Sequence, residues 1–352
     1  MDLSKCIMDF ARSMHQFRKD RDQFGARKIH VYLYKCGLDS HRSLGNYLVS
    51  LLVDVGCMID AQQVFNRIPH QNEWSCSSLM SGYVKQGNPS LALLLFDKMR
   101  MVDDDLVWHA ASLPLLKACT KLKDVDRGIQ VHAKVARLGA VQKDIFIGSA
   151  LVDMYAQCGL LHRAYQTFES LPVKDVVSWT AMVTGYVEHG YGVEALKCFE
   201  QMQLEGVSPD SVTFTCCLKA CGSVGSLKTG EDIEAEVQKN GLLEKDVVLG
   251  TAFVDMYAKF GDLAIAAQVL EELPVRNVVT WNSLIAGYAQ QRQGFEAMDC
   301  FQRMQREGLV PNEVTLLCIL TACNRSGLLN EAQMLYCCMP RAYGITPNIE
   351  HH

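Results

Sequence analysis

The stretch Val-Asp-Met-Tyr-Ala occupies residues 152–156 and recurs letter for letter at residues 254–258, which lie 102 residues further along the chain. The same spacing separates Cys119, Cys221 and Cys323, each of which follows an alanine. Trp179 and Trp281 are also 102 residues apart. One spacing shared by three unrelated patterns indicates an array of repeated units rather than a single wound core.

Turn signals divide each 102-residue unit into three segments. Proline, asparagine or aspartate closes each segment, and the segments that follow from these signals run 176–210, 211–246, 247–277, 278–312 and 313–348. Their lengths are 35, 36, 31, 35 and 36 residues. The same order extends backwards as 145–175, 109–144, 73–108, 42–72 and about 6–41. We therefore expect an N-terminal stub at 1–5, about ten repeats over 6–348, and the opening of an incomplete repeat at 349–352.

Each segment has the pattern of two helices. In 278–312 a first apolar stripe contains Trp281, Leu284 and Ile285, and Gly294 separates it from a second stripe. The second stripe follows the i, i+3, i+4, i+7 spacing of a helix face and consists of Ala297, Cys300, Phe301 and Met304. A pair of helices this short cannot bury its apolar face alone, so neighbouring pairs must stack. The sequence therefore predicts an all-α solenoid.

Composition narrows the function classes. The 352 residues are 49% hydrophobic, yet no apolar run approaches the roughly 20 residues that a membrane span needs. The 15 cysteines form no C-x-x-C motif and many occupy repeat-equivalent apolar positions, which favours small core residues over disulfides or zinc ligands. Lys plus Arg number 34 against 39 Asp plus Glu. A phosphate-binding protein with this balance would have to concentrate its positive charge on one face.

Segments 176–210 and 278–312 resemble a pentatricopeptide repeat. They begin with Val-Val-Ser-Trp-Thr and Val-Val-Thr-Trp-Asn, each carries Glu-Ala at the start of its second stripe, and they end on Ser-Pro-Asp and Val-Pro-Asn. The alternation of lengths resembles the plant subclass in which P, L and S motifs follow in triplets. In that interpretation 73–108, 176–210 and 278–312 are P-type, 6–41, 109–144, 211–246 and 313–348 are L-type, and 42–72, 145–175 and 247–277 are S-type.

The resemblance implies a right-handed superhelix of helix-turn-helix repeats that binds single-stranded organellar RNA, one base per repeat. It implies a site-recognition role in C-to-U editing, in a mitochondrion or a chloroplast, with no cofactor and with a separate deaminase as a further partner. The acidic N-terminal segment is unlike a transit peptide. The organelle is therefore implied by the resemblance alone.

In this family the fifth and last residues of a repeat contact the base. The corresponding pairs here are Asn46 with Asn72, Ser149 with Asp175, Thr180 with Asp210, Thr215 with Asp246, Thr251 with Asn277, and Asn282 with Asn312. The family pattern implies G for 145–175 and 176–210, A for 247–277, and a pyrimidine for 42–72 and 278–312, with C over U in the latter. Leu113 and Leu317 occupy the fifth position of two L-type repeats and indicate spacers, because leucine cannot hydrogen-bond a base edge. Taken singly, each Asn, Asp or Thr is equally typical of a helix cap.

No catalytic or metal-binding residue is predicted. A zinc cytidine deaminase carries H-x-E and P-C-x-x-C, and neither motif occurs in these 352 residues. We therefore expect the chain as given not to be an enzyme and not to deaminate cytidine. Two alternatives stay open at this point. The chain is the N-terminal part of a larger editing enzyme, or it is a helical scaffold for protein partners.

Overall fold

The computed structural model describes residues 3–99, 105–243 and 246–348, and over these ranges it contains α-helices, one short π-helix and no strand. The predicted opening of a further repeat at 349–352 lies outside the described residues. The chain divides into two compact units, Met1–Gly185 and Tyr186–His352, and the division falls within α12 (Val176–Glu188). The prediction of an all-α helical repeat solenoid is confirmed.

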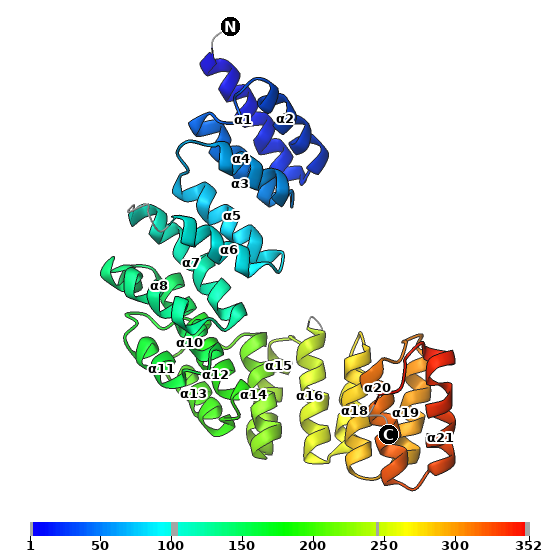
Figure 1. Cartoon of the computed structure of the whole chain (residues 1–352). Coiled ribbons are helices and arrows are strands. Elements are labelled where there is room, and N and C mark those ends of the chain that lie inside the picture. The colour runs from blue at the N-terminus through cyan, green and yellow to red at the C-terminus, as the bar shows by residue number, and fades with distance from the viewer. Residues whose placement is uncertain (1–2, 100–104, 244–245, 349–352) are drawn as a thin grey trace. The chain divides into compact units, whose positions relative to one another are not determined.

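The first unit contains eleven complete helices over its described residues (Figure 1). They are α1 (Leu3–Asp20), α2 (Gln23–Lys35), α3 (Arg42–Asp54), α4 (Met58–Arg67), α5 (Glu73–Lys85), α6 (Pro89–Met99), α7 (Asp105–Leu122), α8 (Val125–Arg137), α9 (Ala140–Lys143), α10 (Ile145–Gln157) and α11 (Leu161–Glu169). Among them α1, α3, α5, α7 and α10 contact one another in succession. These are the first helices of the predicted repeats.

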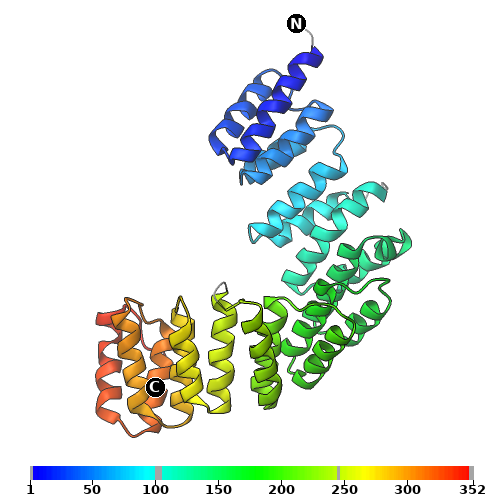
Figure 2. The ribbon, with the colours of Figure 1, turned by 180° about the vertical axis from the view of Figure 1, so that it is seen from behind.

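The second unit continues in the same way. It contains α13 (Gly192–Leu204), α14 (Ser211–Val224), α15 (Leu227–Lys239), α16 (Val247–Phe260), α17 (Leu263–Glu272), α18 (Val278–Gln290), α19 (Gly294–Arg306), α20 (Glu313–Arg325), α21 (Leu329–Cys338) and the π-helix η1 (Met339–Tyr343). The first helices α14, α16, α18 and α20 lie side by side in chain order, as the views from the front and from behind both show (Figures 1 and 2).

Two helices fall within each predicted repeat, with small departures at the ends. α1 begins at Leu3, inside the segment 1–5 that was expected to be a stub, and α7 begins at Asp105, ahead of the predicted start at 109. The short α9 and η1 were not predicted. α9 follows Gly139, whose φ of 64° lies in the left-handed region, and η1 ends at Gly344, whose φ is 66°. The repeat boundaries and the assignment of L, S and P types remain predictions.

The predicted apolar stripes form the core. Trp281 of α18 is fully buried, and all four members of the second stripe of that repeat, on α19, are buried to at least 96%. The second helix α19 packs on the first helix of its own repeat, α18, and on the first helix of the next, α20. The same two contacts are made by α2, α4, α6, α8, α15 and α17. Stacking therefore buries what an isolated pair leaves exposed.

A glycine in the first helix sets how closely neighbouring repeats approach. A Cβ at Gly287 of α18 would lie 2.7 Å from the Cβ of Ala258 on α16, closer than carbon atoms pack. The equivalent Gly185 meets Ala156 at 2.6 Å. The repeated Gly-Tyr and Tyr-Ala sequences thus form the two sides of one contact between successive first helices.

The cysteines at the repeat-equivalent apolar positions behave as predicted. Cys119, Cys221, Cys300 and Cys323 are buried, and the fourteen cysteines from Cys36 to Cys338 are free thiols. Burial raises the pKa of the Cys221 thiol to about 11 and that of Cys300 to about 12. These thiols are therefore protonated at neutral pH and unreactive.

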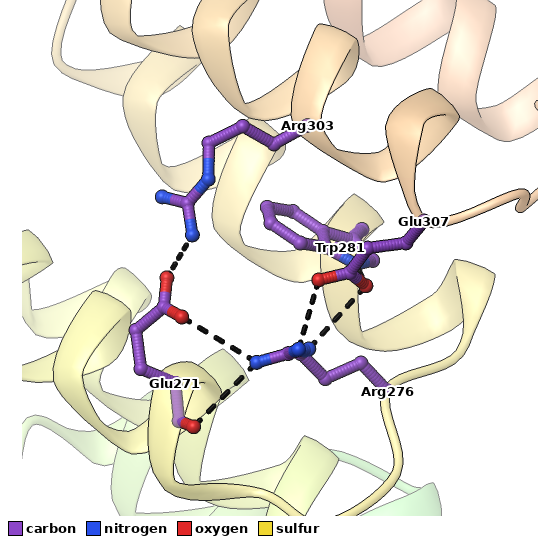
Figure 3. A network of polar contacts seen from close by, with 5 residues as sticks. All are labelled: Glu271, Arg276, Trp281, Arg303 and Glu307. Carbon is purple, nitrogen blue, oxygen red and sulfur yellow. Dashed lines mark hydrogen bonds and ion pairs between the residues drawn. The ribbon is translucent and has the colours of Figure 1, made fainter.

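A polar network joins two consecutive repeats in the second unit (Figure 3). Glu307, at the end of α19, accepts a hydrogen bond of 3.1 Å from the indole Nε1 of the buried Trp281. Its other oxygen lies 2.9 Å from Nη2 of Arg276, and Arg276 reaches Glu271 of α17 at 3.4 Å. Arg303 of α19 also bonds Glu271 and places its guanidinium 5.3 Å from the centre of the Trp281 ring. The network ties α17 to the α18–α19 pair.

We expect Glu307→Ala to lower the midpoint of thermal unfolding. The substitution leaves the buried Trp281 N–H without an acceptor, which costs about 1–3 kcal/mol, or roughly 2–4 °C per kcal/mol in a unit of this size. Circular dichroism against temperature measures the shift. Glu307→Gln keeps one acceptor oxygen and should recover part of the loss. Glu272→Ala, which removes an exposed carboxylate that accepts a hydrogen bond from Gln268 of its own helix, serves as the control. Equal midpoints for Glu307→Ala and the control would show that the network does not stabilise the unit.

Candidate nucleic-acid interface

The last residue of a predicted repeat caps the first helix of the next. Asn72, Asp210, Asp246, Asn277 and Asn312 are the N-cap residues of α5, α14, α16, α18 and α20, and in each the side-chain oxygen accepts a backbone N–H of the first helical turn. In the same way Oδ1 of Asp175 accepts the N–H of Ser178 at 2.8 Å, at the start of α12. The local role of these residues is therefore a cap.

Capping explains why the position is polar and short, but it does not explain the choice between Asp and Asn. The two residues cap a helix about equally well. Aspartate stands at 175, 210 and 246, whereas asparagine stands at 72, 277 and 312. A carboxylate only accepts hydrogen bonds, while an amide also donates two. The identity of the cap residue is thus free to carry a second function without cost to the helix.

The structure brings three of the six predicted pairs into direct contact. The Ser149 hydroxyl donates to Oδ1 of Asp175 at 2.9 Å. Asn282 donates from Nδ2 to Oδ1 of Asn312 at 3.3 Å. Oδ1 of Asn46 accepts the backbone N–H of Asn72 at 3.2 Å. In each pair the fifth residue, on the first helix of a repeat, contacts the last residue of the same repeat, which follows the second helix.

The other three pairs differ. Thr251 lies 2.8 Å from the hydroxyl of Thr280, which in turn donates to Oδ1 of Asn277 at 3.1 Å, so this pair is joined through a third side chain. Thr215 donates to the carbonyl of Ser211, whereas Asp246 caps α16. No hydrogen bond between Thr215 and Asp246 is present among the described residues.

Thr180 and Asp210 belong to different units. Thr180 is half-buried on α12, and Asp210 is an exposed cap of α14. The two predicted spacers, Leu113 on α7 and Leu317 on α20, are half-buried.

Several fifth-position side chains are recessed. Ser149, Asn46, Asn282 and Thr215 expose only 2%, 4%, 7% and 8% of their surface. Asn282 stands out because its Oδ1 is buried without a hydrogen-bond partner among the described residues. A buried acceptor left unpaired costs about 1–3 kcal/mol, and a ligand N–H that reached it would recover that energy.

In most predicted repeats an exposed apolar side chain lies one helical turn before the fifth residue. This position was not predicted from the sequence. The second residue of seven predicted repeats is apolar and 53–71% exposed: Trp74, Phe146, Val177, Val212, Val248, Val279 and Val314. Residues three apart share a helix face, so each lies beside the fifth residue of its own repeat. A row of exposed apolar side chains next to recessed polar ones therefore follows the first helices of each unit.

A cavity of about 530 Å³ lies beside the most N-terminal of the predicted pairs. Asn46 and Asn72 line it together with two arginines and two aromatic residues, namely Arg18, Arg42, Tyr47 and Trp74. Arg18 is held in place by Asp54 at 2.7 Å and by Ser50 at 2.7 Å. The cavity thus combines hydrogen-bonding amides, cationic side chains and aromatic rings in one place.

Comparison with known proteins agrees with the repeat pattern. Residues 174–223 and 276–325 match the profile of the PPR repeat family, and residues 74–102 and 314–342 match that of the PPR repeat. The chain contains pentatricopeptide repeats. The matched segments overlap the predicted repeats 73–108, 176–210, 278–312 and 313–348, and they reach as far as residue 223 of the predicted repeat 211–246.

Curated PPR proteins resemble the chain over nearly its whole length. Pentatricopeptide repeat-containing protein At1g06140, mitochondrial, from Arabidopsis thaliana is 35% identical over 325 residues, which cover 92% of this chain and 58% of that protein. Pentatricopeptide repeat-containing protein At5g50390, chloroplastic, from the same plant is 32% identical over 326 residues, covering 93% of this chain and 46% of that protein. The chain spans about half the length of these relatives.

A solved PPR structure has the same fold. The pentatricopeptide repeat protein PPR10, crystallised in complex with an 18-nt psaJ RNA element, superposes with a TM-score of 0.73. The likeness covers 90% of this chain and 47% of PPR10, at 20% sequence identity. At this identity the comparison supports the helical solenoid fold.

Two further properties of the described residues bear on function. No helix among them is long and apolar enough to cross a bilayer. No cluster of three or more His, Cys, Asp or Glu side chains among them is arranged to hold a metal ion.

Proposed function

We propose that the chain binds single-stranded RNA, one base per repeat, along the first helices of its repeats. The observation that carries the proposal is the recurrence of one local arrangement: an exposed apolar second residue, a recessed polar fifth residue, and a cap residue that contacts it. A base lying against the apolar side chain would direct its polar edge toward the fifth and last residues. Flat apolar surfaces accept any base, whereas the polar pair distinguishes one base from another.

The chemistry of the pairs supports different bases at different repeats. Asn282 presents an unpaired acceptor oxygen, which suits a base edge that donates an N–H. The Ser149 hydroxyl donates its hydrogen bond to Asp175, so it presents only oxygen lone pairs to a base, beside a carboxylate. This arrangement also suits a donor edge such as the N1–H and N2–H₂ of guanine. Both agree with the bases that the family pattern implies, a pyrimidine for 278–312 and G for 145–175.

For the role of the bound RNA we propose C-to-U editing, in which the array selects the site. The alternation of 35-, 36- and 31-residue repeats supports this role through its resemblance to the P-L-S subclass. The deaminase would be supplied by a separate protein or by a further part of a longer chain. A mitochondrial or chloroplast location is proposed on the same basis, and the two relatives above carry one of each term in their names.

Selection from a random RNA pool tests the proposal. Purified protein should enrich a short single-stranded consensus, because base-specific contacts are each worth about 1–3 kcal/mol. The same sequence presented as a duplex should be bound more weakly, since paired bases cannot direct their edges to the repeats. Failure to enrich any sequence from single-stranded RNA would contradict RNA recognition by this chain.

A further inference from the structure

A second polar cavity lies away from the first-helix row, in the first unit. It has a volume of about 370 Å³ and is lined by His132 of α8, by Tyr155 of α10 and by α11 and the residue after it, which contribute Arg163, Gln166, Thr167 and Ser170. α10 contacts both α8 and α11. None of the six residues belongs to the predicted base-contacting pairs.

The cavity is lined by donors and carries positive charge. Tyr155 is 97% buried, and its hydroxyl lies 2.8 Å from Nδ1 of His132. Burial, and then the positive charge of Arg163, lower the pKa of His132. The hydroxyls of Thr167 and Ser170 donate to backbone carbonyls, and Nε2 of Gln166 lies 2.9 Å from Nε2 of His162. His132 and Tyr155 use one proton for the bond between them. The guanidinium of Arg163 is therefore the main donor group that remains to meet a ligand. The six lining residues, all in the described part of the chain, include no carboxylate.

The other two copies of this pair of repeats show which side chains stand at the positions of His132 and Arg163. In the copy 102 residues later, Glu234 replaces His132 and bonds the hydroxyl of Tyr257, while Ile265 replaces Arg163. In the earlier copy His30 faces Asp60, with Nδ1 and Oδ1 3.8 Å apart. Both other copies therefore contain their own carboxylate. The middle copy has an arginine and a histidine and no carboxylate among the six described residues that line it, so an anion from outside would complete it.

We propose that this cavity binds the phosphate group of a small molecule, with Arg163 as the charged anchor. Arg163 offers several N–H groups to the cavity, while the second N–H of Gln166 and one proton of the bonded His132–Tyr155 pair add one donor each. This set of donors matches the three terminal oxygens of a phosphate better than the two oxygens of a carboxylate. Arginine and phosphate also form the strong charge-assisted pairs that fix such groups. The volume lies at the lower end of small-molecule sites and leaves space for a modest organic group beside the phosphate.

Titration calorimetry on the whole chain at constant ionic strength tests the inference, with inorganic phosphate, AMP and acetate as probes. We expect saturable one-to-one binding of phosphate and AMP and weaker binding of acetate. AMP that binds more tightly than phosphate would show that the organic group also contacts the cavity. Arg163→Ile introduces the residue that stands at the equivalent position 265. It should weaken phosphate binding about tenfold or more, since a charged hydrogen bond is lost. His132→Glu supplies the missing carboxylate internally and should have a similar effect.

Arg137→Ile, a change of equal charge at an exposed position of α8 outside the cavity, should leave the affinity unchanged. Circular dichroism should show all three variants folded. Ile265 and Glu234 already stand at the positions equivalent to Arg163 and His132, and Arg137 is exposed. The proposal is overturned if neither phosphate nor AMP saturates the wild-type protein, if Arg163→Ile binds as the wild type does, or if acetate binds as tightly as phosphate. It is also overturned if single-stranded RNA displaces AMP, because the cavity would then belong to the RNA path. Loss of RNA binding with AMP binding intact would contradict the proposed function only.

Discussion

Replacing Asn312 with aspartate should change the base preferred by repeat 278–312 from cytosine toward uracil. The substitution preserves the N-cap of α20 and the oxygen that accepts from Asn282, so the fold is left as it is. It removes the amide donor at residue 312 and leaves acceptors only. Cytosine presents an acceptor at N3, whereas uracil presents an N–H there. The loss of a donor and the gain of an acceptor therefore both favour uracil.

The expected change in the ratio of affinities for the two bases corresponds to about 1–3 kcal/mol, the range for one well-placed base contact. Competition binding with two RNAs that differ only at that base measures it. Asn330→Asp is the matched control, because it makes the same chemical change in the first turn of a second helix, α21. An unchanged C-to-U ratio for Asn312→Asp, or an equal change for the control, would show that residue 312 does not read a base.

Phe146→Ala should weaken RNA binding without weakening the fold. The ring is 70% exposed on α10, one turn before Ser149, so its removal costs the folded protein little. If a base stacks on the ring, the substitution by alanine should make RNA binding weaker by about 1–3 kcal/mol. Fluorescence anisotropy with the selected RNA measures the affinity.

Tyr165→Ala provides the control, because it removes an aromatic ring that is 49% exposed on α11, a second helix away from the predicted row. Its affinity for RNA should match that of the wild type. Equal binding by Phe146→Ala and the wild type would mean that the exposed second residues do not contact bases.

The architecture was predictable because its determinants are local and repeated. The stripe of Ala297, Cys300, Phe301 and Met304 has helical spacing, and one repeat unit can be checked against another along the same chain. The irregular pieces were not predictable. α9 and η1 have no counterpart among the described residues of the other repeats, so repetition gave no signal for them.

The candidate site was predictable only in part. The fifth and last positions were marked by the family resemblance, and the structure adds that the last residue also caps a helix, as Asn277 does for α18. The exposed second residues were missed because a valine such as Val279 looks like a core residue in sequence, and exposure depends on what packs around it. The cavity at Arg163 was missed because it forms only where α8, α10 and α11 meet, across two repeats.

The base order selected by the purified chain from a random RNA pool tests the central claim most directly. Repeats 145–175 and 176–210 should select G at adjacent positions, 247–277 should select A two positions after the second G, and 278–312 should select a pyrimidine next, with C preferred to U. From 5′ to 3′ the expected order is therefore G, G, one position for which no base is assigned, A, C. Enrichment of this order, with its last position altered by Asn312→Asp, is the predicted result. An enriched sequence without this order, or one that the Asn312→Asp variant selects unchanged, would contradict one-base-per-repeat reading by these residues.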